Sequence, residues 1–397
     1  MSSPEDIQCE EQVFDIDFHP SINCIAIGMI DGSVSLYKYG VNEGDNSLMM
    51  SSKLHSKSCR GLVFSEQGDS LYTISSDRSI KGVDGTGAIK MNIEDAHDNP
   101  INKCLILSGL GRTESTMIAT GDDSGCVKIW DTRVSSNNNA IMSWKLHEDF
   151  ISGFSYNHDA STLLSVSGDG TLGVYDVRKA SNTYRSDEQE AELLCVQCIK
   201  GGKKVICGTQ DGVILIFSWG KWGDCSDRYP GHPQTVDCML SIDDTTVFTG
   251  SSDGLIRVVT LQPNKILGVV GDHEDFPVEG IKSSFDRRIL GSFAHDEVLR
   301  FWDVSMLADD DGNDGDDDND NDNDNDNDND DGDDNNEMNE DDDDAEEMEE
   351  GDEQANDDNQ WEDMSESSEF DSGSSDDEPS KAQRHIPTAS EKFFADL

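Results

Sequence analysis

Basic residues are scarce in this chain of 397 residues. Lys and Arg number 29 against 84 Asp and Glu, and the formal net charge is −55. Residues 308–397 hold 40 of the acidic residues and only three basic ones. Neither this part nor residues 1–307 has the basic surplus that neutralises nucleic-acid phosphates. The composition therefore disfavours direct, non-specific binding to RNA or DNA.

The chain also lacks segments that would bring it to a membrane. No apolar run approaches the ~20 residues of a membrane helix, and residues 1–6 lack the charged-then-apolar build of a signal peptide. The ten cysteines are scattered without the framework of a secreted domain, as is typical of a reducing compartment. We therefore expect an intracellular protein without membrane contact.

An acidic tight turn recurs along the chain at intervals of 42 to 46 residues. A period of ~40–45 residues with four short strands per repeat is typical of a β-propeller built from WD repeats. The seven turns begin at Asp31, Asp77, Asp123, Asp169, Asp211, Asp253 and Asp296. We therefore predict an all-β fold, a seven-bladed WD-repeat propeller formed by residues 1–307, which we expect to be monomeric.

The seventh repeat runs out at Asp303, after its third strand. Residues 6–10 precede the first strand, 13–18, and are the candidate for the missing fourth strand. Their pairing with the last blade would close the ring and remove two open sheet edges. We expect deletion of the first ten residues to destabilise the whole domain.

Five repeats combine a histidine with a turn aspartate 21 to 26 residues later, often with Ser or Thr just before the aspartate. A hydrolase triad uses the same residue types. An active site occurs once, however, and this set occurs five times, which favours one structural His–Asp hydrogen bond per blade. The pairs are His55–Asp77, His97–Asp123, His147–Asp169, His232–Asp253 and His273–Asp296.

Two other chemical patterns carry little weight. Cys195 and Cys198 have the spacing of a redox or metal site, but on the expected strand 193–199 two residues three apart point to opposite faces. No second Cys/His pair lies nearby to complete a zinc site, and no GxxxxGK phosphate loop is present. We expect no catalytic residues, no metal and no cofactor.

Residues Trp130, Asp131 and Arg133 resemble the WDxR box with which many WD-repeat proteins dock onto the adaptor of a cullin-RING ubiquitin ligase. A weaker copy one blade later ends in Arg178. Arginine offers a charged, bidentate donor at the blade edge. Since any WD repeat supplies Trp-Asp, an incidental match remains the alternative.

The long connection after the fifth repeat is rich in large side chains. Trp219, Trp222 and Arg228 are the candidates for an unusual binding surface there. A packed loop that bridges two blades is the alternative explanation.

Residues 308–380 form an acidic, low-complexity tail that cannot bury enough apolar surface to order itself, and we expect it to be disordered. It is either a solvating tail or a polyanion that attracts basic proteins. Ser368, Ser374 and Ser375 each precede an acidic residue by three positions, the pattern of acidophilic kinases. Residues 381–397 end in Phe393, Phe394 and Leu397, which indicate a short linear motif.

Several segments together resemble the WD repeat-containing protein 55 family: 126–133, 147–153, 204–210, 224–228 and 393–397. The resemblance implies a eukaryotic protein of the nucleus and nucleolus that serves ribosomal RNA production and large-subunit assembly, without catalytic residues or a cofactor. Relatives often carry a Lys/Arg-rich stretch after the acidic tract. This chain has only Lys381, Arg384 and Lys392 there, so nuclear import would require a carrier. The cytoplasm is therefore an additional expected location.

Three functional hypotheses follow. The first is a non-catalytic scaffold whose partners are pre-ribosomal assembly factors. The second is a substrate receptor of a cullin-RING ligase that docks through Arg133. The third is a chaperone that holds basic proteins with the acidic tail, by binding that weakens steeply with salt.

Overall fold

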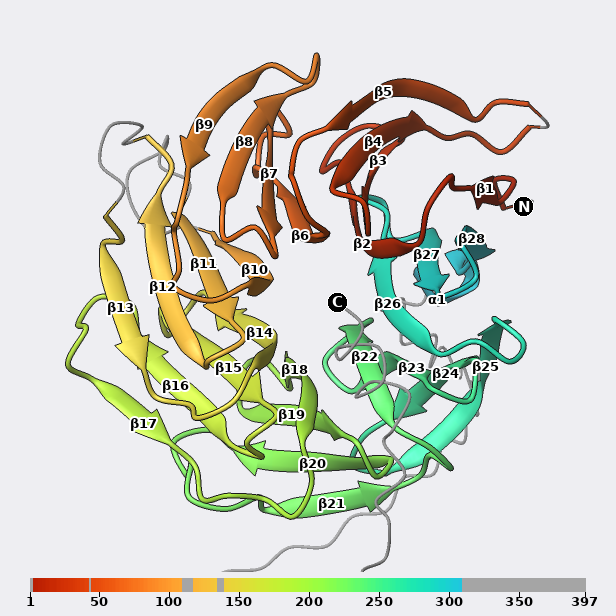
Figure 1. The fold of residues 1–397 in the computed structure, drawn as a ribbon. Coiled ribbons are helices and arrows are strands. Elements are labelled where there is room, and N and C mark those ends of the chain that lie inside the picture. The colour runs from red at the N-terminus through yellow and green to blue at the C-terminus, as the bar shows by residue number, and fades with distance from the viewer. Residues whose placement is uncertain (1–2, 43, 109–116, 134–138, 309–397) are drawn as a thin grey trace, which may run out of the picture. The chain divides into compact units, whose positions relative to one another are not determined.

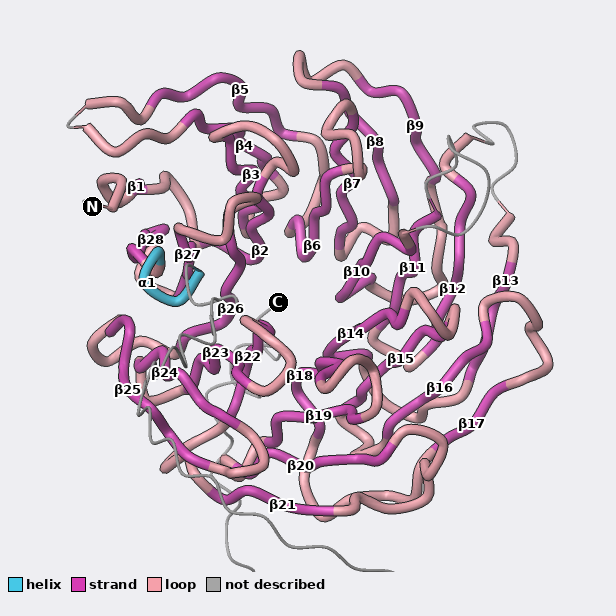
Figure 2. The backbone as a smooth tube through the Cα atoms, turned by 180° about the vertical axis from the view of Figure 1, so that it is seen from behind, coloured by secondary structure: helices cyan, strands magenta, loops and turns pink. Residues whose placement is uncertain are grey.

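The computed structural model describes residues 3–42, 44–108, 117–133 and 139–308. They form seven antiparallel sheets of four strands each, arranged as blades around a central axis (Figure 1). The innermost strands of successive blades face the centre, and the outermost strands form the rim, as the view from behind also shows (Figure 2). The predicted seven-bladed propeller is confirmed.

Each of the first six blades is a meander of four consecutive strands. Blade 1 comprises β2 (Val13–Phe18), β3 (Cys24–Met29), β4 (Ser33–Lys38) and β5 (Ser47–Lys53). Blade 2 comprises β6 (Cys59–Phe64), β7 (Ser70–Ser75), β8 (Ile80–Asp84) and β9 (Ile89–Ile93). Blade 3 comprises β10 (Ile101–Leu107), β11 (Met117–Asp122), β12 (Cys126–Asp131) and β13 (Met142–Lys145). Blade 4 comprises β14 (Ile151–Asn157), β15 (Thr162–Ser167), β16 (Leu172–Asp176) and β17 (Thr183–Arg185). Blade 5 comprises β18 (Leu193–Ile199), β19 (Lys204–Thr209), β20 (Val213–Ser218) and β21 (Asp227–Pro230). Blade 6 comprises β22 (Val236–Ser241), β23 (Thr246–Ser251), β24 (Leu255–Thr260) and β25 (Lys265–Asp272).

Blade 7 takes its outer strand from the other end of the chain. It comprises β26 (Val278–Ser283), β27 (Ile289–Ala294), β28 (Val298–Asp303) and β1 (Ile7–Gln8). In this blade Ile7 pairs with Leu299 and Gln8 with Val298. The strand expected from residues 6–10 therefore lies where the incomplete seventh repeat required it. A short helix, α1 (Ser305–Ala308), follows β28.

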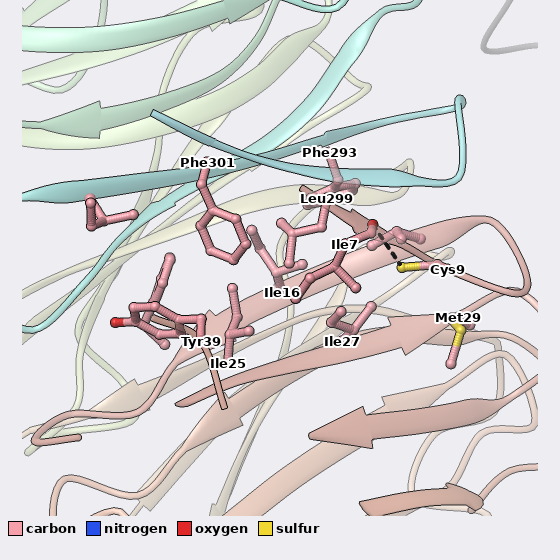
Figure 3. Packing of buried hydrophobic residues seen from close by; sticks show 13 residues of the cluster. Ile7, Cys9, Ile16, Ile25, Ile27, Met29, Tyr39, Phe293, Leu299 and Phe301 are labelled. Carbon is pink, nitrogen blue, oxygen red and sulfur yellow. Dashed lines mark hydrogen bonds between the residues drawn. The ribbon is translucent and has the colours of Figure 1, made fainter. Parts of the chain in front are cut away.

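Apolar side chains fill the space between neighbouring blades. Figure 3 shows the cluster at the closure, where Ile7 and Leu299 of blade 7 meet Ile16 and Ile27 of blade 1. Equivalent clusters lie at the other six blade interfaces. Alternating strand residues thus pack sheet against sheet, and the fold has no single central core.

A bulge recurs near the start of every inner strand. The pairing register shifts between the first and third residue of β2, β6, β10, β14, β18, β22 and β26. A bulge increases the local twist and re-aims the side chains that follow. The seven inner strands therefore bend alike, which gives the repeats a common shape despite their different sequences.

The acidic turns follow the second strand of each blade and need a left-handed residue. Gly212 has φ +81°, and a Cβ there would lie 2.5 Å from the carbonyl oxygen of Gln234. Arg78 and Glu297 hold the same turn position with φ 69° and 58°. The two turns without glycine thus keep the backbone shape at a steric cost.

Candidate interaction surfaces

Buried histidines link the acidic turns to the sheets. In blade 2, Nδ1 of His55 lies 3.3 Å from the Asp77 carboxylate, and Nε2 lies 2.9 Å from Oγ1 of Thr73. His147 and His273 make the same two contacts in blades 4 and 7, with Asp169 and Asp296 as carboxylate partners. The structure therefore brings together three of the five predicted pairs.

In blade 3 the predicted pair His97–Asp123 is wrong, because the carboxylate beside His97 belongs to Asp122. Nδ1 of His97 lies 2.9 Å from Asp122, which is almost fully buried at the end of β11 and also accepts hydrogen bonds from two backbone N–H groups. Asp123 instead lies 3.1 Å from Arg60 of blade 2. The N–H of Gly125 donates to the Asp122 carbonyl as the N–H of Arg78 does to Ser75, so Asp122 stands two positions before the place that Asp77 holds in its turn.

In blade 6 the predicted hydrogen bond between His232 and Asp253 is absent. Nε2 of His232 meets Thr249 at 2.9 Å, while its Nδ1 is buried without a partner among the described residues. The Asp253 carboxylate accepts two hydrogen bonds from Arg257 instead. Burial and the positive charge of Arg257 lower the pKa of His232 to about 4.

Two blades extend this network to a tryptophan. Nε1 of Trp130 donates to Thr120 at 2.8 Å, and Nε1 of Trp302 donates to Ser292 at 2.7 Å. Each hydroxyl also meets the histidine of its blade. Four side chains thus connect the turn, the preceding loop and two strands, as expected of a structural element in a WD blade.

The charges of these groups suit a structural role. Burial lowers the pKa of His97. Burial alone would raise the pKa of the Asp77 carboxyl, but hydrogen bonds from His55 and Ser79 hold it below its usual range. His55, His97, His147 and His273 are each at most 2% exposed. A substrate in solvent does not reach imidazoles that are this deeply buried, so they do not form accessible triads.

Within the described part of the chain, one group of side chains has metal-ligand geometry: His97, Asp122 and Cys126, whose ligand atoms lie within 4.8 Å of one another. Both ring nitrogens of His97 already take part in hydrogen bonds, and burial raises the pKa of the Cys126 thiol. A metal would have to displace this network and deprotonate the thiol. The residues fit the structural network better than they fit a metal.

The Cys195-x-x-Cys198 pair is split between two blade interfaces. Cys195 belongs to the cluster between blades 5 and 6, whereas Cys198 packs against the cluster between blades 4 and 5. Their thiols have separate neighbours, the Val236 carbonyl and the Ser155 hydroxyl. Burial raises the pKa of both thiols. The diverging sulfurs expected on a strand are therefore present.

The candidate adaptor-docking residues are arranged alike in blades 3 and 4. The Arg133 guanidinium forms two hydrogen bonds with the Asp131 carboxylate, at 3.0 and 2.6 Å, and Arg178 forms the same pair with Asp176. Both arginine side chains are more than half exposed. Trp130, in contrast, is buried and supports the blade from inside. The exposed part of the predicted box is therefore an arginine held by its own aspartate.

Trp219 and Trp222 pack together with ring centroids 4.9 Å apart. Both are partly buried against the apolar cluster between blades 4 and 5, as the packed-loop alternative expects. A cavity of about 480 Å³ beside them is also lined by Tyr184 and Arg178. Arg228 lies elsewhere on blade 5, near Glu190.

The sequence patterns did not point to the charged residues of the inner strands as contacts between blades. Asp15 and Asp17 of β2 accept hydrogen bonds from backbone N–H groups of β6, at 2.9 Å each. Lys282 of β26 lies 3.7 Å from Asp17. Their signal in the sequence is a charge at the third or fifth position of the first strand in a repeat. These side chains join blade 7 to blade 1 and blade 1 to blade 2.

The candidate phosphorylation sites Ser368, Ser374 and Ser375, the motif residues Phe393, Phe394 and Leu397, and the acidic tail all lie outside the described residues. In the part that is described, no helix is long and apolar enough to cross a membrane.

The chain is similar to known proteins over its whole propeller. The model of the WDR55 family matches residues 4–307. WD repeat-containing protein 55 of Arabidopsis thaliana is 42% identical over 306 residues, which cover 76% of this chain and 83% of that protein. The human protein of the same name is 36% identical, with 77% and 78% covered. WD repeat-containing protein JIP5 of Coprinopsis cinerea is 39% identical, with 75% and 74% covered.

Proposed function

The chain belongs to the WDR55 family, and from this membership we propose that it is a non-catalytic scaffold for protein–protein interactions in ribosome biogenesis. The proposed role covers ribosomal RNA synthesis or processing and large-subunit assembly, in the nucleus and nucleolus. WD-repeat propellers are typically scaffolds, because loops on a rigid ring offer several separate binding surfaces.

One observation carries the scaffold assignment. The repeated His, Asp and Ser/Thr side chains, which would be the first candidates for chemistry, bond to one another inside the blades. What the described propeller presents to solvent is loop side chains and strand edges, and these suit recognition of other proteins.

The ribosomal part of the proposal is tested by depletion. Loss of the protein should change the levels of ribosomal RNA precursors and lower the amount of large subunits. Precursors would be measured by hybridisation and subunits by gradient sedimentation, with re-expression of the full chain as the control. Unchanged precursors after complete depletion would contradict the proposal.

A second function is favoured by the geometry of Arg133 and Arg178. Each is held by a neighbouring aspartate in the same two-bonded arrangement, and each lies two residues after the end of the third strand of its blade. Two arginines fixed in this way on adjacent blades suit docking onto an acidic partner surface, such as a cullin-RING ligase adaptor.

The docking hypothesis is tested with charge-reversed variants. Affinity purification of Arg133→Glu and Arg178→Glu chains should lose the ligase adaptor and retain pre-ribosomal factors. Lys179→Glu is a matched control, because Lys179 is an exposed neighbour of Arg178 outside the arginine–aspartate pair. Equal recovery of the adaptor with all three variants would exclude docking through these arginines.

A further inference from the structure

Blade 5 (β18–β21) lacks the polar network that the histidines form in other blades. In blades 2, 3, 4 and 6 a histidine stands four residues before the inner strand, and Gln189 stands there in blade 5. The hydroxyl that meets the histidine is replaced by Cys207 of β19, and the aromatic donor of β12 and β28 is replaced by Phe217. The turn carboxylate of this blade, Asp211, thus has no histidine beside it.

Asp211 differs from the turn carboxylates of the other six blades. Each of those lies within 4 Å of a basic side chain, in the pairs Lys53–Asp31, His55–Asp77, His97–Asp122, His147–Asp169, Arg257–Asp253 and His273–Asp296. Asp211 receives a hydrogen bond from the Thr209 hydroxyl, and none of the described Lys, Arg or His side chains forms an ion pair with it. Asp211 is exposed, unlike the other six, so this blade offers a solvent-facing carboxylate without a cation from its own sequence.

The side chain of Gln189 provides a second open acceptor. It is only 8% exposed, its Nε2 donates to the Asp187 carbonyl at 3.0 Å, and its Oε1 has no partner within the described structure. Exchanging the amide nitrogen and oxygen would set two oxygens against each other at Asp187, so the contact defines the orientation. A buried carbonyl oxygen without a donor is rare in a native fold and indicates a missing donor.

Gln189 and Asp211 both belong to the lining of one cavity of about 110 Å³. Glu190 adds a second carboxylate, and Val213 and Leu215 contribute an apolar wall. A single water occupies ~30 Å³ of liquid, so the cavity has room for more than one water. A lining that combines carboxylates with apolar side chains matches a side chain with an aliphatic stem and a cationic end.

The surrounding charge favours a cation. The loop before β18 carries four acidic residues among 187–192. Arg228 also lines the cavity, but its Nη1 lies 3.8 Å from Glu190 and its Nε donates to the thiol of Cys225. This arginine offsets one carboxylate and leaves the loop and Asp211 negative. Opposite charge in a partly closed site raises the local concentration of a cationic group.

We propose that this pocket of blade 5 binds the cationic end of a lysine or arginine side chain from a basic segment of a partner protein. Asp211 supplies the charge, and Gln189 Oε1 accepts one hydrogen bond from the incoming ammonium or guanidinium. The partner thereby provides the base that the other six blades contain within their own sequence.

The test uses the full-length protein and three capped peptides, Gly-Ala-X-Ala-Gly, in which X is lysine, arginine or norleucine. Binding is followed through the backbone amide resonances of the isotope-labelled chain at millimolar peptide. The lysine or the arginine peptide should shift the amides of 189–191 and 211–213, and the better binder identifies the group. Norleucine has the stem without the charge and should leave them unchanged.

Variants separate a specific site from general acidity. Gln189→His places in blade 5 the base of the other blades, and Asp211→Asn removes the charge; each should weaken binding by about threefold or more. Glu188→Gln removes one charge from the same loop outside the cavity lining and should change affinity less than about twofold. Circular dichroism checks that each variant is folded. If the Gln189→His variant does not fold, the Asp211→Asn variant alone tests the proposal. Equal shifts with norleucine, or unchanged binding by Asp211→Asn, would overturn the proposal.

Discussion

At the scale of single residues, one position in a turn decides which carboxylate a histidine meets. Asp122 and Asp123 are adjacent, yet Asp122 is buried against His97 and Asp123 reaches Arg60 in the preceding blade. Repeat spacing favours Asp123, which lies 46 residues from both Asp77 and Asp169, whereas Asp122 lies 45 and 47 residues from them. The distinction depends on where β11 ends and on which side chain then points inward.

Asparagine at these two positions should have unequal effects. Asp122→Asn weakens the contact with His97 and the two backbone bonds at a buried site, and we expect a loss of about 2–3 kcal/mol of unfolding free energy. Asp123→Asn changes a partly exposed ion pair and should cost less than about 1 kcal/mol. Urea unfolding of both variants measures the difference, and a larger loss for Asp123→Asn would contradict the network described for blade 3.

The pKa of His232 predicts acid sensitivity. Burial and Arg257 lower this pKa to about 4, with Asp253 acting in the opposite direction, while the unfolded chain has the usual value of ~6.5. Between these values the unfolded state binds more protons, so stability falls as the pH drops from 6.5 to 4. At pH 5 the shifted pKa of His232 lowers the free energy of unfolding by about 2 kcal/mol relative to neutral pH.

The matched variant is His232→Gln, which keeps a side-chain nitrogen near Thr249 and does not titrate. Its unfolding free energy should fall less than that of the parent between pH 7 and pH 5, as measured by urea unfolding at both values. Equal losses in the two proteins would show that His232 does not contribute to acid sensitivity.

At the scale of elements, the shortest strand closes the ring. β1 has two residues, yet Ile7 is buried among side chains of blades 1 and 7 (Figure 3). Gln8, the other residue of β1, is exposed. The backbone of Cys9 adds a hydrogen bond to Glu297 at 2.9 Å. A strand this short holds its place through one apolar anchor and the edge it covers.

Two substitutions in β1 test this anchor. Ile7→Ala should lower the free energy of unfolding by about 2–3 kcal/mol, because it opens a cavity in the closure cluster. Gln8→Ala, one residue on and exposed, should change it by less than about 0.5 kcal/mol. Thermal unfolding followed by circular dichroism checks both variants. Similar melting temperatures for Ile7→Ala and the parent would mean that β1 does not anchor the ring.

At the scale of the whole molecule, the two ends of the repeat array meet at a charged contact as well as an apolar one. Lys282 of blade 7 faces Asp17 of blade 1, and Asp17 also accepts from a backbone N–H of blade 2. Three consecutive blades are therefore joined near the axis. Partial burial acts to lower the pKa of Lys282, but the negative charges of Asp17 and Asp15 outweigh it and raise this pKa.

A double-mutant cycle measures this closure contact. Lys282→Met leaves Asp17 without its cation and should destabilise the ring, whereas Lys282→Met combined with Asp17→Asn should cost less than the sum of the single changes. Because Lys282 is partly exposed, we expect a coupling free energy of about 1 kcal/mol. Strict additivity in urea unfolding would show that the pair does not stabilise the closure.

The sequence alone determined the architecture, because turns and alternating strands repeat with one period and each is a local property of the chain. It also indicated that residues near the N-terminus complete the last blade, since seven repeats supply only 27 of the 28 strands. Tertiary structure decided what depends on distant neighbours: Asp122 over Asp123, Arg257 in place of His232, and the unpaired acceptors of blade 5. Those outcomes depend on which side chains from different strands and loops become neighbours in the folded ring, and no local sequence pattern specifies that.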